Sequence, residues 1–255
     1  MKISIITATF NSSDTLRDTI KSVLAQDYDN WEHIIVDGNS TDNTVDIIRE
    51  YQPFYKGRLK WISEPDRGIY DAMNKGISMS LGEVIGILNS DDFYTSNDIL
   101  SIIHQNFLNI DAVYGDVHYV NHHNPTQIVR YYSSADFKRW KMRIGFMPAH
   151  PSFYCRREIY SQFGMFDTDF HIAADFEQLL RLIYVNKISI RYIAKDFVTM
   201  RTGGASSSGF QSHKRIIMEH LKAYHKNKVK SGISFEAIRY LWRIGEMIKF
   251  KILNK

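Results

Sequence analysis

The sequence predicts an α/β fold with a doubly wound, mostly parallel sheet and a C-terminal helical tail. Through the first 110 residues, short runs of β-branched and apolar residues alternate with amphipathic helical stretches. This alternation is typical of parallel strands joined by crossover helices. The four strands expected there each end in a polar or acidic cluster. Since ligands of open α/β folds bind beyond the carboxyl ends of the strands, the same pattern predicts where a binding site lies.

The first half of the chain contains four expected strands, each followed by an expected helix. The first strand covers 3–9, and the helix after it carries Leu16, Ile20 and Val23 on one face. The fourth strand is nearly all apolar, which is typical of a central parallel strand. The other strands are expected at 31–36, 59–63 and 83–88, and the other helices at 42–51, 69–79 and 97–107.

The pattern changes after residue 110, where the regular alternation ends. A turn-rich link of Asn, His and Pro at 121–125 joins two expected strands into a hairpin. We expect one α/β domain over 1–210 and a helical tail over 211–255. The elements expected after the first half are strands at 112–120, 127–132, 188–193 and 197–201, a helix at 174–184 and a small-residue loop at 203–209.

The charge of the chain is concentrated in its tail. From His213 to Lys255 there are 11 Lys or Arg and 3 Glu, a balance of +8, which leaves −4 for the rest of a chain whose net charge is +4. Such an asymmetry indicates that the tail meets an anionic surface, such as the inner face of a membrane, or presents a solvated helical face. Apolar residues on one side of 235–253 fit an interfacial helix or a helix packed on the body.

The single cysteine, Cys155, excludes an intrachain disulfide and a zinc site built on cysteines. A reducing, cytoplasmic setting follows as the expectation. No run of about 18 apolar residues is present, so no membrane-spanning helix is expected. The tail also lacks a recognisable nucleic-acid motif, and we expect no nucleic-acid partner.

The most informative cluster is the acidic pair Asp91 and Asp92, which follows the apolar strand expected at 83–88. A carboxylate resists burial unless it is paired or bound to a metal. Carboxylate oxygens suit Mg²⁺ or Mn²⁺, and these cations bridge phosphate oxygens. The pair therefore predicts a cation that carries a diphosphate. The alternative is an acidic pair at a helix N-terminus.

Two other strand exits supply candidate ligand groups. Asp37 is followed by Gly38, which permits a tight turn, and its carboxylate could accept a hydrogen bond from a base imide. The alternative is a turn that caps the next helix. Thr7 and Asn11 follow the first strand and offer hydroxyl and amide groups to a nucleotide. Their alternative role is to start the first helix.

The segment that follows the third expected strand has the sequence Glu-Pro-Asp-Arg-Gly at 64–68. Asp66 is the candidate ligand there, and Arg67 can neutralise phosphate charge. Asn74 lies three residues after Asp71, so both side chains share one helix face. The alternative is an ordinary polar helix surface.

Two candidates come from the second half of the chain. Asp175 stands at the start of the helix expected at 174–184, where a capping carboxylate is common and a general base is the alternative. His150, which precedes Pro151, is a candidate for the acceptor site or the lid, and the alternative is a structural histidine. No G-x-G-x-x-G, P-loop or G-x-S-x-G motif is present, so redox, P-loop and esterase chemistries are poorly supported.

These residues occur in a set of motifs that resembles the large inverting glycosyltransferase family 2, which has the GT-A fold. Several motifs in the same order cover about residues 1–210, and this makes the resemblance much more specific than any one of them. The motifs are SIITATFN from Ser4, IIVDGNSTDNT from Ile34, SEPDRGIYDAMNKG from Ser63, GILNSDD from Gly86, HPSFY from His150, AADFEQLLRL from Ala173 and MRTGGAS from Met200.

The resemblance implies that Asp37 binds the base of a nucleotide-sugar, and that Thr7 and Asn11 line the same pocket. It also implies that Asp92, with Asp91, holds Mn²⁺ or Mg²⁺ in place of the family's D-x-D motif. The order Asn-Ser-Asp-Asp at 89–92 departs from a strict D-x-D motif.

For the second half of the chain, the resemblance implies that Asp175 is the catalytic base. The loop that contains Gly203 and Gly204 would fold over the bound donor. Residues 1–110 would then form the nucleotide-sugar half, and 111–210 the acceptor half.

The expected function is transfer of a hexose or N-acetylhexosamine from a nucleotide-diphosphate sugar, UDP-linked, to a lipid-linked bacterial cell-surface glycan such as a polysaccharide, O-antigen or capsule. One alternative is a non-catalytic module that binds nucleotide-sugars or glycans. Another is a sugar nucleotidyltransferase, but such enzymes have a glycine-rich loop with arginine after the first strand, and 7–13 contains neither residue.

Overall fold

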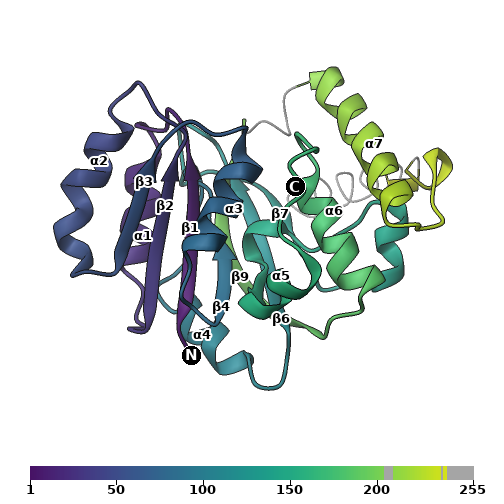
Figure 1. Cartoon of the computed structure of the whole chain (residues 1–255), viewed down its shortest axis with the longest axis horizontal. Coiled ribbons are helices and arrows are strands. Elements are labelled where there is room, and N and C mark those ends of the chain that lie inside the picture. The colour runs from purple at the N-terminus through teal and green to yellow at the C-terminus, as the bar shows by residue number, and fades with distance from the viewer. Residues whose placement is uncertain (204–208, 237, 240–255) are drawn as a thin grey trace.

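Nine strands of the described residues form one mixed sheet that runs through the molecule (Figure 1). The structure is a computed structural model, and it describes residues 1–203, 209–236 and 238–239 of the chain. The strand order is β3-β2-β1-β4-β8-β6-β9-β5, and β7 pairs with β6 outside this path.

The first half of the sheet is parallel, as predicted. Its four strands pair in the order β3-β2-β1-β4, with Thr9 beside Asp37 and Asp37 beside Ser63 at the carboxyl edge. The strands are β1 (Ile3–Thr9), β2 (Trp31–Asp37), β3 (Leu59–Ser63) and β4 (Val84–Ile87), and the helices between them are α1 (Leu16–Leu24), α2 (Thr44–Tyr51), the 3-10 turn Gln52–Tyr55 and α3 (Ile69–Met79).

The second half joins this sheet through an antiparallel strand, β8, beside β4. A Cβ atom at Gly86 would lie 2.1 Å from the Tyr154 ring, so a side chain at position 86 would push β8 away from β4. The elements are β5 (Phe93–Tyr94), α4 (Ile99–Asn106), β6 (Ala112–Val120), β7 (Ile128–Tyr132), β8 (Tyr154–Arg156), α5 (Arg157–Phe163), α6 (Ala174–Leu179), β9 (Ile190–Arg201) and α7 (Gly209–Lys226), with 3-10 turns at Arg139–Ile144 and His150–Ser152 and a π-helical segment at Leu180–Val185.

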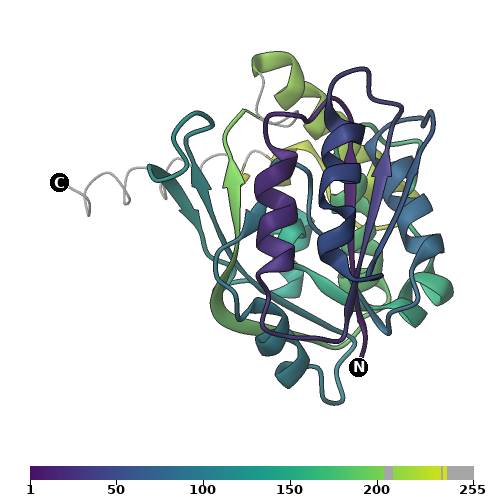
Figure 2. The same cartoon turned by 90° about the vertical axis from the view of Figure 1, so that its left-hand side faces the viewer.

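Apolar residues cover both faces of the sheet and make three layers. Side chains of α3, α5 and α6 pack with the strands on one face. Those of α1, α2 and α4 pack on the other face, and α1 and α2 face the viewer in Figure 2. The fold class is therefore as predicted.

The two short strands expected at 188–193 and 197–201 are one strand, β9, and the prediction of a break was wrong. The polar residues between the two expected strands have partners on neighbouring elements. Lys195 pairs with Asp98 at 3.0 Å, and Asp196 pairs with His118 at 2.5 Å. The pairing of β9 with β6 shifts register around Asp116, and β9 carries the extra residues.

The expected tail begins with α7, which packs on the body. Ala223 and Tyr224 are buried, and the Tyr224 hydroxyl donates to the Met142 carbonyl at 3.0 Å. Most of the segment 235–253 lies outside the described residues. In the part of the chain that the structure describes, no helix combines the length and the apolar character needed to cross a bilayer.

Candidate active site

A cavity of about 880 Å³ lies beyond the carboxyl ends of β1 and β4. The lining comes from the loops after β1, β3 and β4 and the start of α3. It is completed by the β6–β7 hairpin, the 145–151 segment, the start of α6, the end of β9 and α7. The hairpin is the teal ribbon at the upper left of Figure 2. The lining includes Thr9, Phe10, Ser12, Asp66, Asn89, Asp91, Asp92, His150, Asp175, Arg201 and Gly203.

The loop after β4 places two carboxylates at the floor of this cavity. The Leu88 N–H donates to the Ile6 carbonyl at 2.9 Å, and the Asp92 N–H turns back to the Asn89 carbonyl at 3.1 Å. Asp92 is only 1% exposed. Burial raises its pKa well above the ordinary value, and the neighbouring Asp91 adds to the shift. Burial also raises the pKa of Asp91.

Two buried oxygens of this loop lack a hydrogen-bond partner among the described residues: Asp92 Oδ2 and Asn89 Oδ1. Buried polar atoms are nearly always satisfied, so an orphaned pair indicates a missing ligand. With the Asp91 carboxylate they form a set of hard oxygen donors that fits Mg²⁺ or Mn²⁺. Within the described ranges, no group of three or more His, Cys, Asp and Glu residues could hold a metal.

Arg201, at the end of β9, holds the acidic loop in place. Its guanidinium donates to the Asp91 carbonyl at 2.7 Å and pairs with Asp18 of α1. The same group lies 5.0 Å from the centre of the Phe93 ring. The positive charge of Arg201 opposes the rise in the pKa of both aspartates. Sequence reasoning missed Arg201, because its partners Asp91 and Asp18 lie far away in the chain.

Asp175 faces the same cavity from the first turn of α6. Its Oδ1 accepts the Phe176 N–H at 2.8 Å, and the Tyr70 hydroxyl lies 3.5 Å from the same oxygen. Burial raises the pKa of Asp175 to about 6. A carboxylate of this kind is charged at neutral pH and is basic enough to accept a proton. The structure therefore brings a candidate base and a candidate cation site to one cavity.

Residues 4–170 match the model of glycosyl transferase family 2. The chain belongs to this family. It is 33% identical over 210 residues to an uncharacterized glycosyltransferase of Mycobacterium tuberculosis, a match that covers 79% of this chain and 76% of the relative. It is also 28% identical over 194 residues to a PGL/p-HBAD biosynthesis glycosyltransferase of Mycobacterium bovis, covering 74% of this chain and 73% of that relative.

Solved structures of glycosyltransferases share the fold of this transferase, which confirms the predicted GT-A architecture. Staphylococcus aureus TarS superimposes with a TM-score of 0.66 at 19% identity, covering 88% of this chain and 43% of that chain. TarS 1-349 in complex with UDP-GlcNAc superimposes with a TM-score of 0.66 at 18% identity, covering 86% of this chain and 66% of that chain. The mannosyltransferase PcManGT of Pyrobaculum calidifontis in complex with GDP-Man and Mn²⁺ superimposes with a TM-score of 0.63 at 14% identity. This match covers 96% of this chain and 80% of that chain.

Three other predicted residues of the transferase also line the cavity. Asp66 Oδ1 accepts the Gly68 N–H at 2.8 Å, and a Cβ atom at position 38 would lie 2.6 Å from Asp66 Oδ2, so Gly38 makes room for this carboxylate. His150 is buried, and burial lowers its pKa to about 4, which leaves the ring neutral. Gly203 lies at the cavity with a φ of +106°. Gly204 lies outside the described residues.

Asp37 and Thr7 are not among the residues that line the cavity, because both are buried at the edge of the sheet. The Asp37 carboxylate accepts the Ser40 N–H at 3.0 Å and the Ser63 hydroxyl at 2.6 Å. The Thr7 hydroxyl donates to the Leu88 carbonyl at 2.7 Å. Both side chains therefore tie neighbouring loops together.

Asn11, Arg67 and Asn74 are likewise not brought to the cavity lining. The Asn11 side chain accepts the Thr41 N–H at 2.9 Å and links two loops. Arg67 is exposed and pairs with Asp71 at 2.8 Å. Both ends of the Asn74 amide bind the backbone of Phe166, at 2.8 and 2.9 Å. These contacts fix the shape of the loops around the site.

The β6–β7 hairpin contributes groups that sequence reasoning missed. Tyr119, Arg130 and Tyr132 line the cavity, and the Arg130 guanidinium lies 5.7 Å from the centre of each tyrosine ring. The available signal was a basic residue followed by two tyrosines in the sequence Ile-Val-Arg-Tyr-Tyr at 128–132. These side chains give the second half of the chain a cationic, aromatic wall.

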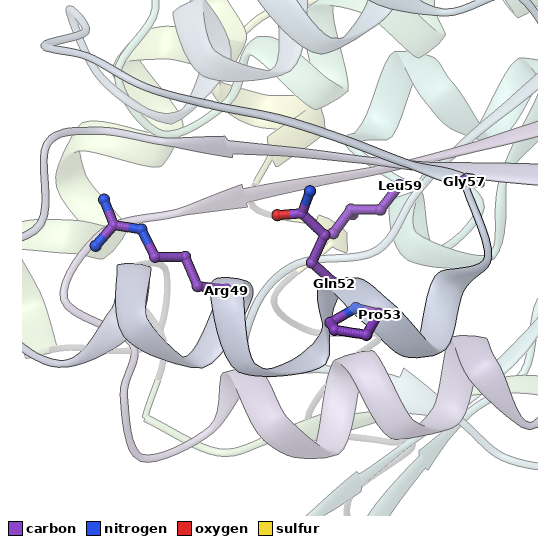
Figure 3. A pocket seen from close by; sticks show the side chains of 5 residues that line it. All are labelled: Arg49, Gln52, Pro53, Gly57 and Leu59. Atoms are coloured by element: carbon purple, nitrogen blue, oxygen red, sulfur yellow. The ribbon is translucent and has the colours of Figure 1, made fainter.

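A second hollow, of about 480 Å³, lies beside the end of α2 and the start of β3 (Figure 3). Arg49, Gln52, Pro53, Gly57 and Leu59 line it, and they include no carboxylate or histidine. The groups suited to the chemistry of a transferase lie at the larger cavity.

Replacing Asp92 by Asn tests whether the buried carboxylate opposes folding when no metal is bound. Because the folded-state pKa is raised well above 3.8, the folded chain binds this proton more tightly than the unfolded chain, and ionisation opposes folding at every pH above about 4. We expect Asp92→Asn to raise the thermal unfolding midpoint at pH 7 in EDTA by roughly 2–4 °C, or about 1 kcal/mol. The gain should shrink toward pH 4.

The matched control is Asp46→Asn on α2, whose side chain is 74% exposed and should leave the midpoint unchanged. Added Mn²⁺ with a nucleoside diphosphate should stabilise the original chain and not Asp92→Asn, because ligand binding raises apparent stability. A lower midpoint for Asp92→Asn in EDTA would show that the carboxylate stabilises the metal-free fold, contrary to this account.

Proposed function

We propose that this glycosyltransferase is an inverting, metal-dependent enzyme that uses a nucleotide-diphosphate sugar, UDP-linked, as its donor. The transferred group is a hexose or N-acetylhexosamine, and the acceptor is a hydroxyl of a growing, lipid-linked bacterial cell-surface glycan. One observation carries the proposal: the Asp175 carboxylate and the orphaned oxygens of the 89–92 loop face one cavity. The relative named for PGL/p-HBAD biosynthesis supports a biosynthetic role.

The donor belongs to the half of the cavity built by residues 1–110. Phe10 and Ile69 line this part and are 59% and 43% exposed, so they offer apolar surface to a base. Asp66 and Asp91 are the carboxylates available for polar contacts. Direct binding of the base by Asp37 would require Ser40 and Ser63 to release its carboxylate. The TarS complexes with UDP-GlcNAc and UDP and the PcManGT complex with GDP-Man support this donor class.

The reaction follows from the position of Asp175. Its carboxylate takes the proton of the acceptor hydroxyl as that oxygen attacks the anomeric carbon from the face opposite the diphosphate. The new C–O bond forms while the bond from the sugar to the diphosphate breaks, and the nucleoside diphosphate leaves with its electron pair. Asp91, Asp92 and Asn89 would hold Mg²⁺ or Mn²⁺, which stabilises the charge on that leaving group.

The acceptor belongs to the half built by residues 111–210. Arg130 and its flanking tyrosines form the wall opposite the donor loops. His150 is neutral and lies where it can hydrogen-bond a sugar hydroxyl. Gly203 begins the loop proposed to close over the donor.

Asp175→Asn tests the base directly. We expect release of nucleoside diphosphate from UDP- and GDP-sugars, measured with Mn²⁺ and acceptor glycans, to fall by roughly 10²–10⁴-fold, because the amide cannot take the proton. The donor-induced rise in the unfolding midpoint should remain.

Asp136→Asn, an exposed change in the same half, serves as the control. If Asp175→Asn turns over normally, Asp175 is not the catalytic base. Release of pyrophosphate would identify a sugar nucleotidyltransferase, and donor binding with no turnover by the original chain would identify a binding module.

The pH dependence of kcat gives a second test. Asp175 acts as a base only when it is deprotonated, and its pKa is raised to about 6. At saturating donor and Mn²⁺, kcat should therefore fall below pH 6 and level off above pH 7, since kcat reports groups in the enzyme–substrate complex. A rate that stays constant from pH 5 to pH 7.5 would contradict the assignment.

We also propose that the basic tail, 211–255, binds peripherally to the inner face of the membrane, where a lipid-linked acceptor would lie. Its charge supports this, as do Ile233 and Ile238, which are 69% and 45% exposed. We expect the full chain to co-sediment with phosphatidylglycerol liposomes, and replacement of Arg243, Lys249 and Lys251 by Gln to weaken this binding, because each basic residue near an anionic surface contributes about 1 kcal/mol.

Substitution is preferable to truncation in this experiment because α7 packs on the body. The control replaces Lys21, Lys56 and Lys187, which are exposed on the body, by Gln. Equal losses of liposome binding in the two variants would show that the tail has no special role.

A further inference from the structure

A single carboxylate of α7 binds the loop that precedes the Asp175 helix. Glu219 accepts the backbone N–H groups of three successive residues: His171 at 3.0 and 3.2 Å, Ile172 at 2.9 Å and Ala173 at 2.8 Å. Glu219 is only 8% exposed. Hydrogen bonds to an ionised acceptor are roughly twice as strong as neutral ones. Within the described residues, no Lys, Arg or His forms a salt bridge with this carboxylate, so backbone N–H groups are its polar partners.

The same loop is held from the opposite side by α3. The Tyr70 hydroxyl donates to the Ile172 carbonyl at 2.7 Å, and it also lies 3.5 Å from Asp175 Oδ1. Residue 172 is therefore fixed at its N–H by α7 and at its carbonyl by α3. Lys222, one turn along α7, adds a bond to the Asp169 carbonyl at 2.8 Å. These contacts determine where α6 begins, and Asp175 is its second residue.

We propose that Glu219 is a positioning residue for the catalytic base. Its carboxylate fixes the 171–173 loop so that Asp175 points into the cavity, and α7 is thereby a working part of the active site. The proposal rests on the function assigned above to Asp175. A misplacement of about 1 Å can cost roughly 10²-fold in rate, so a contact behind the base is enough to control turnover.

The charge of Glu219 provides a second, independent signature. Among the described residues, two side chains bear on the ionisation of Asp175: the Tyr70 hydroxyl of α3 and the Glu219 carboxylate of α7. The other ionisable groups that line this part of the cavity are His150, His171, His220 and Arg239. Burial is the main cause of the raised pKa of Asp175, and the negative charge of Glu219 raises it further. Removing that charge should lower the apparent pKa of the base. A general loosening that hydrates Asp175 would lower it too, so the two are separated by whether faster hydrogen exchange is confined to the 171–173 amides.

The test compares Glu219→Gln with Glu219→Asp in the full chain. For Glu219→Gln we expect kcat for nucleoside diphosphate release to fall roughly 10²-fold and the apparent pKa in the kcat profile to fall, with the donor KM within about twofold of the original. Glu219→Asp keeps the charge and should recover part of the rate. Lys226→Gln is the matched control, because it removes another contact between α7 and the body, to Asp167, away from the base.

Hydrogen exchange of the 171–173 amides separates this proposal from the function on which it rests. We expect faster exchange there in Glu219→Gln and not in Lys226→Gln, whether or not a productive donor has been found. Unchanged exchange, or a kcat within twofold of the original in Glu219→Gln, overturns the positioning role. If Glu219→Gln does not fold, a Glu219→Asp variant with the rate and exchange of the original chain overturns it. Absence of any turnover by the original chain counts against the proposed function alone.

Discussion

A carboxylate cannot stay charged in a protein interior without a compensating charge, and this constraint shapes the centre of the molecule. Asp92 is buried beside Asp91 at the end of a central strand. Arg201 lies nearby, but its guanidinium binds the Asp91 backbone and Asp18 and leaves Asp92 Oδ2 without a partner among the described residues. The buried carboxylates therefore lack a compensating positive charge in the described part of the chain, and a divalent cation bound to a diphosphate would supply it.

The parts of the fold that sequence could predict are those governed by local periodicity and end signals. The helix at 69–79 and the strand at 112–120 have the expected bounds. In each segment the apolar residues recur with a regular period, and a residue that ends the element follows. The three-residue strand β8 was missed because it is too short to show a period. It exists because glycine at position 86 allows Tyr154 to pack against the sheet. The unbroken β9 likewise depends on partners for Lys195 and Asp196 that lie far away in the chain.

The candidate site shows the same division between local and distant information. The position of the acidic pair at the cavity was predictable because two adjacent carboxylates are unusual after a buried apolar strand. Asp175 was singled out by the motif that resembles the family, since a carboxylate at a helix start is common. The placement of Asp37 was not, because it depends on serine hydroxyl and backbone groups beyond its own strand, and these make its carboxylate part of the scaffold. Arg201 and Glu219 looked like ordinary strand and helix residues. Their roles come from contacts to Asp91 and to the 171–173 loop, which no local pattern encodes.

The bond from Arg201 to Asp91 also has a consequence for biosynthesis, because it joins residues 110 positions apart. On the ribosome, the nascent chain presents its acidic loop long before the arginine emerges. An N-terminal fragment contains the four parallel strands but lacks the cation that holds this loop. The two halves of the transferase are thus expected to mature together once the last strand is released, although N-terminal portions of larger proteins generally fold first.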